Sequence, residues 1–329
     1  MSLLNPIDPK LLFTKNDPRD VRLGDLAKLP PSFKTLSELQ ATLEELKPGA
    51  FTLTGYPDDE GISKNGGRIG AAEAPDRIRN YFYRMTPPAF SGTQSDAEIY
   101  DLGNLPVKAL DLAQRHDRAQ EIAREAHQNG QRAISFGGGH DYGFPDAAAY
   151  CEWARARKEK PLVINFDAHL DVRPMNHGIT SGTPFFRLLE EFPETEFVEI
   201  GLQAQCNSRA HVEWLKAKGG LLSFEEERHA RGESLTETLA RLLGDKALKS
   251  RTAFLSVDID AFTSAVAPGA SQSWPTGFDP SDFFSCFTWC LGRFDVRGLG
   301  LYEVSPRLDI DDRTSRLAAL IAYRFVFQL

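Results

Sequence analysis

The chain has 329 residues, of which 41% are hydrophobic and 26% charged, which is ordinary for a globular protein with a sizeable core and excludes general disorder. Acidic residues outnumber basic ones by 46 to 38, the net charge is -8, and no Lys/Arg run is present to follow a phosphate backbone, which argues against a nucleic-acid partner. Residues 1–20 lack a signal-peptide pattern and no run of about 18 apolar residues occurs, so we expect no membrane association and a cytoplasmic protein.

Residues 1–50, rich in Pro and Leu, are expected to form an N-terminal extension packed on a single domain, residues 1–329, because no linker-like stretch divides the chain. Eight short β-branched and apolar runs predict strands. In chain order these runs are AFTLTGY near 50, AEIYDLG near 98, RAISFGG near 132, PLVINFDAH near 161, TEFVEIG near 195, GGLLSF near 219, TAFLSVDID near 252 and VRGLGLYEV near 296.

Stretches with helical spacing lie between most of these runs. AQEIAREAHQNG, for example, ends in a glycine suited to a helix C-terminus. The four cysteines, Cys151, Cys206, Cys286 and Cys290, show no CxxC spacing, and the last two fit one helix flank, so we expect reduced structural thiols. The alternation of strands and helices predicts an α/β fold of three layers, α/β/α, with a mainly parallel eight-stranded sheet.

Polar side chains follow three of the predicted strands, in FGGGHDYG, NFDAHLDVRP and SVDIDAF. In an extended segment Asp167, His169 and Asp171 project to one face, and Asp258 and Asp260 do the same. Because ligands of parallel sheets bind beyond the carboxyl ends of the strands, we expect these segments to converge there.

His140 follows three glycines, which we expect to let the backbone approach a metal closely. Four aspartates in one crevice would repel one another by about 4 kcal/mol per pair at roughly 4 Å and an effective dielectric near 20, so two divalent cations are expected to neutralise them. Hard oxygen ligands with two imidazoles and no thiolate favour manganese, with iron, cobalt or zinc as substitutes. Each aspartate alone could equally be a helix cap or turn residue; their grouping favours the metal site.

Together GGGHD, FDAHLD, SVDID and GLYEVSP resemble the ureohydrolase family, which contains arginase, agmatinase and formimidoylglutamase. The resemblance runs from about residue 50 to the end and implies an arginase-like fold with two Mn²⁺ ions per chain. It implies these ligands for one ion: His140, Asp167, Asp171 and Asp258. It implies these for the other: Asp167, His169, Asp258 and Asp260. Glu303, in LYEVSP, matches the family glutamate that accepts hydrogen bonds from the substrate's amidine or guanidine nitrogens.

The chain departs from arginase, because Ser181 begins the sequence SGTP where arginases carry HG-x-P with their proton-shuttle histidine. His177 lies nearby as a possible substitute or a plain loop histidine. ITSGTPF, with Ser181, DVRP and DIDAFTSAVAPGAS, looks most like formimidoylglutamase, which implies N-formimidoyl-L-glutamate as a small-molecule substrate. Arg173 is expected to hold one substrate carboxylate, with Arg68 as a weaker candidate, and Ser181 is also expected to contact the substrate. Arg187 is expected to be a solvated helix residue.

The expected reaction is attack of a metal-activated water on the amidine carbon, which releases L-glutamate and formamide in histidine degradation. Glu303 would stabilise the positive nitrogen end and Asp171 would relay the proton toward the departing amine. Two alternatives stay open: an agmatinase or guanidinobutyrase-like amidinohydrolase that releases urea, and a non-catalytic metal-binding homologue. The resemblance also implies a homo-oligomer, although nothing in the sequence shows an interface.

Overall fold

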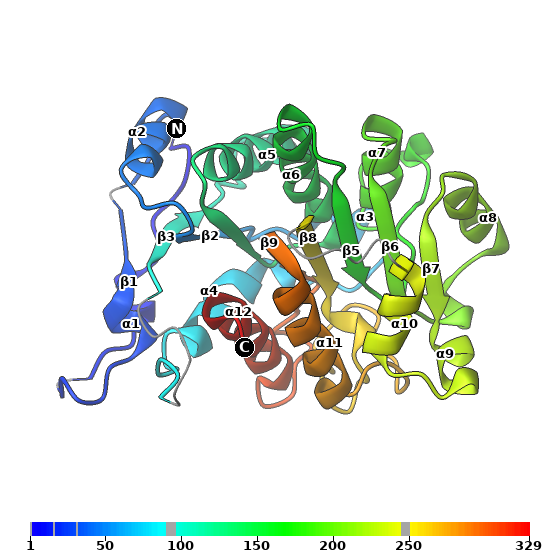
Figure 1. The fold of residues 1–329 in the computed structure, drawn as a ribbon. Helices are drawn as coiled ribbons and strands as arrows, with labels where there is room; N and C mark the ends of the chain where they lie inside the picture. The colour runs from blue at the N-terminus through cyan, green and yellow to red at the C-terminus, as the bar shows by residue number, and fades with distance from the viewer. Residues whose placement is uncertain (1, 16, 31, 90–96, 245–250) are drawn as a thin grey trace.

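The computed structural model describes residues 2–15, 17–30, 32–89, 97–244 and 251–329, and its strands form one nine-stranded sheet (Figure 1). The strands are β1 (Ala27–Lys28), β2 (Phe51–Gly55), β3 (Ile99–Asn104), β4 (Arg132–Phe136), β5 (Leu162–Phe166), β6 (Glu196–Leu202), β7 (Leu221–Phe224), β8 (Arg251–Asp258) and β9 (Phe294–Tyr302). Their order in the sheet is β1-β3-β2-β4-β9-β8-β5-β6-β7, and every pairing between them is parallel.

All eight predicted strands are present, and the expected count was short by one. The missed strand, β1, has two residues, neither of them buried, and it carries no apolar run that a sequence pattern could register. It pairs with the edge of the sheet through Ala27 and Ile99, so the N-terminal extension adds a strand to the sheet. In the same extension Leu39 and Leu43 of α2 (Leu36–Glu44) join a buried cluster with Ala119 and Ile122.

Helices cover both faces of the sheet, as the three-layer prediction required (Figure 1). One face carries α2, α5 (Leu112–Gln128), α6 (Gly143–Ala156), α7 (Pro184–Glu191) and α8 (Arg209–Ala217). The other carries α4 (Ala74–Phe82), α9 (Glu225–Arg231), α10 (Leu235–Leu243), α11 (Pro280–Arg293) and α12 (Arg313–Phe327). The short helices α1 (Leu23–Leu26) and α3 (Glu60–Lys64) lie in connecting segments.

Two local predictions about helices are confirmed. AQEIAREAHQNG forms the second half of α5, which is followed by Gly130 at a φ of 84°, a left-handed conformation that glycine adopts without strain. Cys286 and Cys290 lie on α11 and are both buried, and all four cysteines are free.

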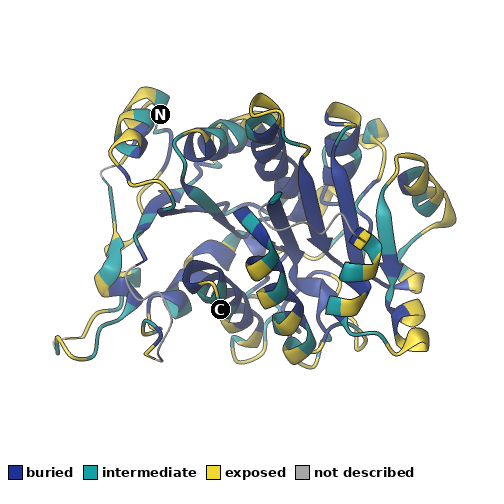
Figure 2. Cartoon of the chain, viewed as in Figure 1, coloured by how far each residue is buried: buried dark blue, intermediate teal, exposed yellow. Residues whose placement is uncertain are grey.

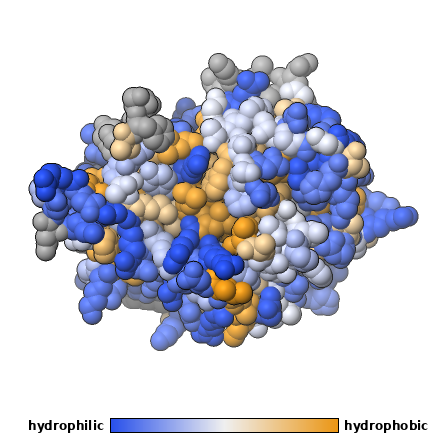
Figure 3. Space-filling view, turned by 90° about the horizontal axis from the view of Figure 1, so that it is seen from below, coloured by the Kyte–Doolittle hydropathy of each residue, from blue (hydrophilic) through white to orange (hydrophobic). Residues whose placement is uncertain are grey.

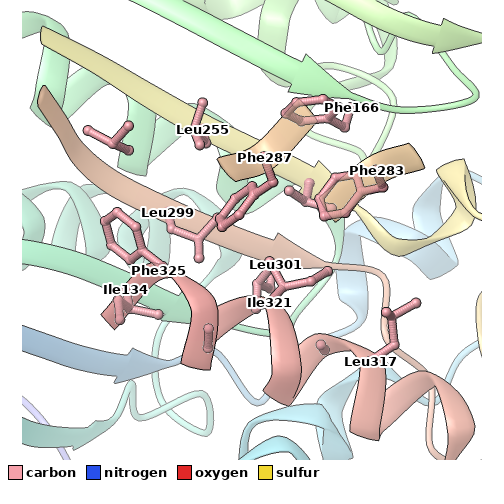
Figure 4. Close-up of a cluster of buried hydrophobic side chains, with 14 of the residues drawn as sticks. Ile134, Phe166, Leu255, Phe283, Phe287, Leu299, Leu301, Leu317, Ile321 and Phe325 are labelled. Atoms are coloured by element: carbon pink, nitrogen blue, oxygen red, sulfur yellow. The ribbon is translucent and has the colours of Figure 1, made fainter. Parts of the chain in front are cut away.

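The central strands of the sheet are buried on both sides, and exposed residues lie mainly on the outer faces of the helices and in the loops (Figure 2). Between the sheet and the α4, α10, α11 and α12 layer, side chains such as Phe166, Leu255, Phe287, Leu299 and Phe325 pack in one cluster (Figure 4). Seen from below, hydrophobic residues gather near the middle of the molecular surface with hydrophilic residues around them (Figure 3). Within the described ranges, no helix combines the length and apolar character that crossing a bilayer would take.

The carboxyl ends of five neighbouring strands, β4, β9, β8, β5 and β6, lie side by side in the sheet. Their registers align the last residues: Phe136 pairs with Leu301, Asp258 with Tyr302, and Phe166 with Val257 and with Ile200. Every segment that leaves these strands therefore starts at the same edge, which is where a ligand site of a parallel sheet forms.

Candidate metal centre

Two groups of imidazole and carboxylate atoms meet at this edge. In the first, which we call the His140 cluster, Nδ1 of His140 lies 2.9 Å from Oδ2 of Asp167, 3.0 Å from Oδ2 of Asp171 and 3.1 Å from Oδ2 of Asp258. In the second, the His169 cluster, Nδ1 of His169 lies 3.2 Å from an oxygen of Asp260 and 3.5 Å from Oδ1 of Asp167. In each cluster the candidate ligand atoms lie within 4.8 Å of one another.

The structure thus brings together all six residues that the sequence singled out as metal ligands. Asp167 belongs to both clusters and turns Oδ2 to one and Oδ1 to the other, as a bridging ligand must. Asp258, which the resemblance implied as a second bridging ligand, belongs to the His140 cluster alone, and its Oδ1 accepts a hydrogen bond of 2.9 Å from the backbone N–H of Asp260.

The local backbone differs from the extended conformation that the sequence suggested for NFDAHLDVRP. β5 ends at Phe166, the next residues form bends, and Asp171 has a left-handed φ of 48°. Ala168 and Leu170 are buried, so the alternation does separate ligands from core residues, but a turn rather than a strand achieves it. After β8, Asp260 lies in a short 3₁₀ turn in the same way.

The three glycines before His140 are needed for the turn itself, a role beside the expected close approach of the backbone to a metal. Gly137 and Gly138 have φ values of 76° and 80°, which favour glycine. A Cβ at Gly137 would lie 2.8 Å from Cβ of Ala74 and 2.9 Å from Cδ of Pro75, at the start of α4. The glycines therefore let β4 turn sharply beneath α4 and place His140 at the edge of the sheet.

Electrostatics at the site are dominated by buried carboxylates. Burial, reinforced by Asp260 and Asp167, raises the pKa of Asp258 well above its ordinary value. Burial likewise raises the pKa of Asp260 to about 6, against the opposing effect of His169. Burial also lowers the pKa of His140, but the three aspartates that face its ring outweigh this and raise the pKa well above the usual value. Neighbouring protein groups therefore shift the pKa values of these side chains away from their ordinary values.

The unpartnered atoms of the site fit divalent cations. Nε2 of His140 contacts Oγ of Ser256 at 2.9 Å, while its buried Nδ1 faces three carboxylates without a hydrogen bond of acceptable geometry. Oδ1 of Asp260 is also buried and unpartnered. Within the described part of the chain, the ion pairs of the four aspartates involve His140 and His169 and no Lys or Arg. A nitrogen with a free lone pair facing several carboxylate oxygens is what a metal ion would coordinate.

A cavity of about 280 Å³ opens over the two clusters. Arg173, Ser181 and Glu303, all predicted to contact substrate, line it together with His169, Asp171, Asp258 and Asp260. Glu303 has a left-handed φ of 62°, and its Oε1 accepts a 3.1 Å hydrogen bond from the backbone N–H of His140. Burial raises the pKa of Glu303 well above its usual value, so a cationic partner in the cavity would favour its ionised form.

Two other side chains considered from the sequence, Arg68 and His177, do not line this cavity. Arg68 donates from Nε and one terminal nitrogen to the backbone carbonyls of Ser271 and Ala270, so it joins two loops outside the lining of the cavity. His177 is exposed in a 3₁₀ turn outside the lining, which removes the support for it as a proton shuttle.

The expectation that Arg187 is solvated was wrong. Its guanidinium lies over the ring of Phe144 at 3.6 Å and hydrogen-bonds Nδ1 of His116 at 2.8 Å. Burial lowers the pKa of Arg187 to about 10. It belongs to a buried network beneath the site and is absent from the cavity wall.

The sequence did not lead us to expect that the segment after β6 forms a wall of the cavity. Gln205, Cys206, Asn207 and His211 all line the cavity, so Cys206 is not the purely structural thiol that we expected. The signal was present in QAQCNSRAH, a polar run directly after the predicted strand TEFVEIG. It was overlooked because it contains no alternating acids.

Comparisons with known proteins agree with this geometry. The family model described as the arginase family matches residues 50–328. The chain is similar to the formimidoylglutamase of Staphylococcus carnosus, 27% identical over 88% of this chain and 90% of that protein, and to that of Staphylococcus haemolyticus, 26% identical over 97% and 98%. Among solved structures, it resembles Trypanosoma cruzi formiminoglutamase with Mn²⁺, with a TM-score of 0.76 and 26% identity over 88% of this chain and 97% of that one. The formimidoylglutamase of Bacillus subtilis shares the fold, with a TM-score of 0.80 at 23% identity over 95% and 93% of the chains.

Proposed function

The chain belongs to the arginase family, and from that premise we propose that it is a binuclear manganese hydrolase that converts N-formimidoyl-L-glutamate and water to L-glutamate and formamide. The observation that carries the proposal is the pair of clusters that share Asp167 on the floor of a cavity. The relatives named formimidoylglutamase and the manganese named for the Trypanosoma cruzi structure support the choice of substrate and metal.

The metal ligands in this proposal are the six residues of the clusters: His140, Asp167, His169, Asp171, Asp258 and Asp260. When bound, two divalent cations would supply Lewis acidity that makes a water nucleophilic near neutral pH. Side chains of the protein would bind the substrate and transfer the proton.

Glu303 would hold the amidine, because its carboxylate lines the cavity and Oε1 is already oriented by the backbone of His140. A planar amidinium presents N–H groups that a carboxylate accepts, and stabilising the positive nitrogen end favours attack at the carbon. Asp171, which is partly exposed and borders the same cavity, would carry the proton from the attacking water to the departing amine. That protonation lets the C–N bond break and glutamate leave as an amine.

The other end of the substrate carries two carboxylates. Arg173 lines the cavity and is the one Lys or Arg among the lining residues, so we assign it to one of these carboxylates. Ser181, which accepts a 3.1 Å hydrogen bond from Nδ2 of Asn65, offers its hydroxyl to the same ligand.

The test is a side-by-side assay of manganese-loaded protein with formimidoylglutamate, agmatine, arginine and guanidinobutyrate. We expect glutamate release from the first and no urea at a comparable rate from the others. Urea from a guanidino substrate without glutamate release would instead favour the agmatinase-like alternative. Metal uptake without any hydrolysis would favour a non-catalytic homologue.

We further propose that the whole chain acts as one domain in the cytoplasm and assembles with its own copies. β1 extends the sheet from within residues 1–50, which supports a single unit. The four free cysteines suit a reducing compartment. Chromatography with light scattering would give the number of copies.

A further inference from the structure

The segment that follows β6 forms a wall of the cavity to which the activity just described assigns no role. β6 neighbours β5 in the sheet, so this segment starts beside the turn that carries Asp167, His169 and Asp171. His211, near the start of α8, lines the cavity together with Arg173.

Asn207 fixes this wall against the ligand-bearing turn. Its Oδ1 accepts a 2.9 Å hydrogen bond from the backbone N–H of Leu170, and its Nδ2 donates to the carbonyls of Ala168 at 2.8 Å and Gln203 at 2.9 Å. The next residue, Ser208, caps α8 by accepting a hydrogen bond of 3.3 Å from the backbone N–H of His211. The position of His211 is therefore tied to that of the metal-ligand turn.

His211 and Arg173 present uncommitted polar atoms to the cavity. Within the described ranges no side-chain hydrogen bond is found for either residue, whereas the guanidinium groups of Arg68 and Arg187 are both engaged by protein groups. Partial burial and the charge of Arg173 lower the pKa of His211, against the opposing effect of Asp171. A neutral imidazole beside an arginine keeps one N–H to donate and adds no second positive charge.

We propose that His211 is a specificity-determining residue of the cavity, which donates a hydrogen bond from its imidazole to a substrate carboxylate that Arg173 also binds. The inference rests on the proposed function, since it needs a substrate with an anionic tail. It gives a reason for the fixed position of this wall: a carboxylate recognised by two donors in defined positions discriminates against tails that carry an amine.

The test compares His211→Phe with the wild type, both loaded with manganese. We expect the KM for formimidoylglutamate to rise about tenfold while kcat stays within about twofold, because a hydrogen bond to a charged group is lost equally from ground and transition states. The Kd of glutarate, a dicarboxylate without the reacting amidine, should rise by about the same factor in calorimetry. His211→Gln, which keeps an N–H donor, should fall between the two.

His177→Phe is the matched control, because it makes the same change at an exposed histidine outside the cavity and should alter nothing. Equal glutarate affinity in wild type and His211→Phe would overturn the inference, as would a lower kcat at unchanged KM. Unchanged melting temperatures and metal content ensure that the comparison concerns folded, loaded protein. A wild type that releases no glutamate would instead refute the proposed function, whereas glutarate binding reports on His211 whether or not turnover occurs.

Discussion

Buried acidic side chains have different charge partners in two halves of the sheet. Near β2 and β3 they are neutralised by arginines of the chain itself: Nε of Arg79 lies 2.7 Å from Oδ2 of Asp101, and Arg115 pairs with Asp58. Beyond the carboxyl ends of β5 and β8, three equally buried aspartates and the partly exposed Asp171 pair with histidines alone in the described ranges.

The second half therefore lacks arginines that could neutralise its aspartates. Leaving a charge buried without a partner costs several kcal/mol, roughly, which is why the first half supplies arginines. A chain that pairs its acids with arginines in one place, and gathers four acids without a Lys or Arg partner in another, has a second place suited to cations from outside. The missing arginines thus favour a metal centre on physical grounds, independently of family resemblance.

Asp258→Asn should have the largest effect on function. It removes a ligand of the His140 cluster, so we expect loss of tight manganese binding and of turnover. In metal-free protein near neutral pH the same change should raise the melting temperature, because a carboxyl whose pKa is raised by burial costs stability there and a neutral amide removes that cost. Calorimetry with and without manganese measures both. Full activity with two bound ions would contradict the role given to Asp258.

Asp101→Asn is the matching change in the other half and should act in the opposite way. It leaves the guanidinium of Arg79 buried without its carboxylate, which should lower the free energy of unfolding by about 3–5 kcal/mol. Manganese content should stay at the wild-type value. A variant as stable as the wild type in urea denaturation would break the comparison, since the arginine would then not depend on its acid.

Much of this contrast was readable from the sequence, and part of it was not. All strands except β1 were predicted, because buried parallel strands read as apolar runs. Five of the six ligands were found because DAHLD and DID place acids and a histidine directly after such runs, and His140 was found in the run GGGHD after another. The partner of Asp101 could not be predicted, since Arg79 reaches it from a helix 22 residues earlier and one arginine in a helix looks like another. For the same reason Arg187 was assigned to solvent although it stacks on Phe144.

Arg173 sharpens the comparison, because it is a cation beside the acidic centre that pairs with none of its acids in the described ranges. If it is reserved for a substrate carboxylate, Arg173→Ala should raise the KM for formimidoylglutamate by about 10- to 100-fold, in keeping with the loss of a charge-assisted pair. Arg173→Lys should restore part of the affinity but not the bidentate geometry. Steady-state kinetics decide, and an unchanged KM in the alanine variant would remove this assignment.

His127 offers a smaller test, as a buried histidine without the carboxylates that surround His140. Burial, together with Arg297, lowers its pKa from 6.5 to about 3, and neither ring nitrogen has a partner in the described structure. The folded state therefore holds His127 neutral, so its contribution to stability is complete above the unfolded pKa and is lost as the pH falls from about 6.5 toward about 3.

The steepest part of that loss should approach 1.4 kcal/mol per pH unit, roughly, for one proton. His127→Phe, which keeps a ring at the site, should flatten the decline of unfolding free energy between about pH 6 and about pH 4. Urea denaturation across that range compares the two proteins. Parallel curves would mean that His127 does not titrate on unfolding as proposed.

The most direct test of the central claim is a crystal structure of manganese-loaded protein with anomalous diffraction data. The account predicts two manganese peaks, one within the His140 cluster and one within the His169 cluster, with Asp167 between them. Two unoccupied clusters at saturating manganese, with the aspartates paired to Lys or Arg side chains or turned toward solvent, would contradict it.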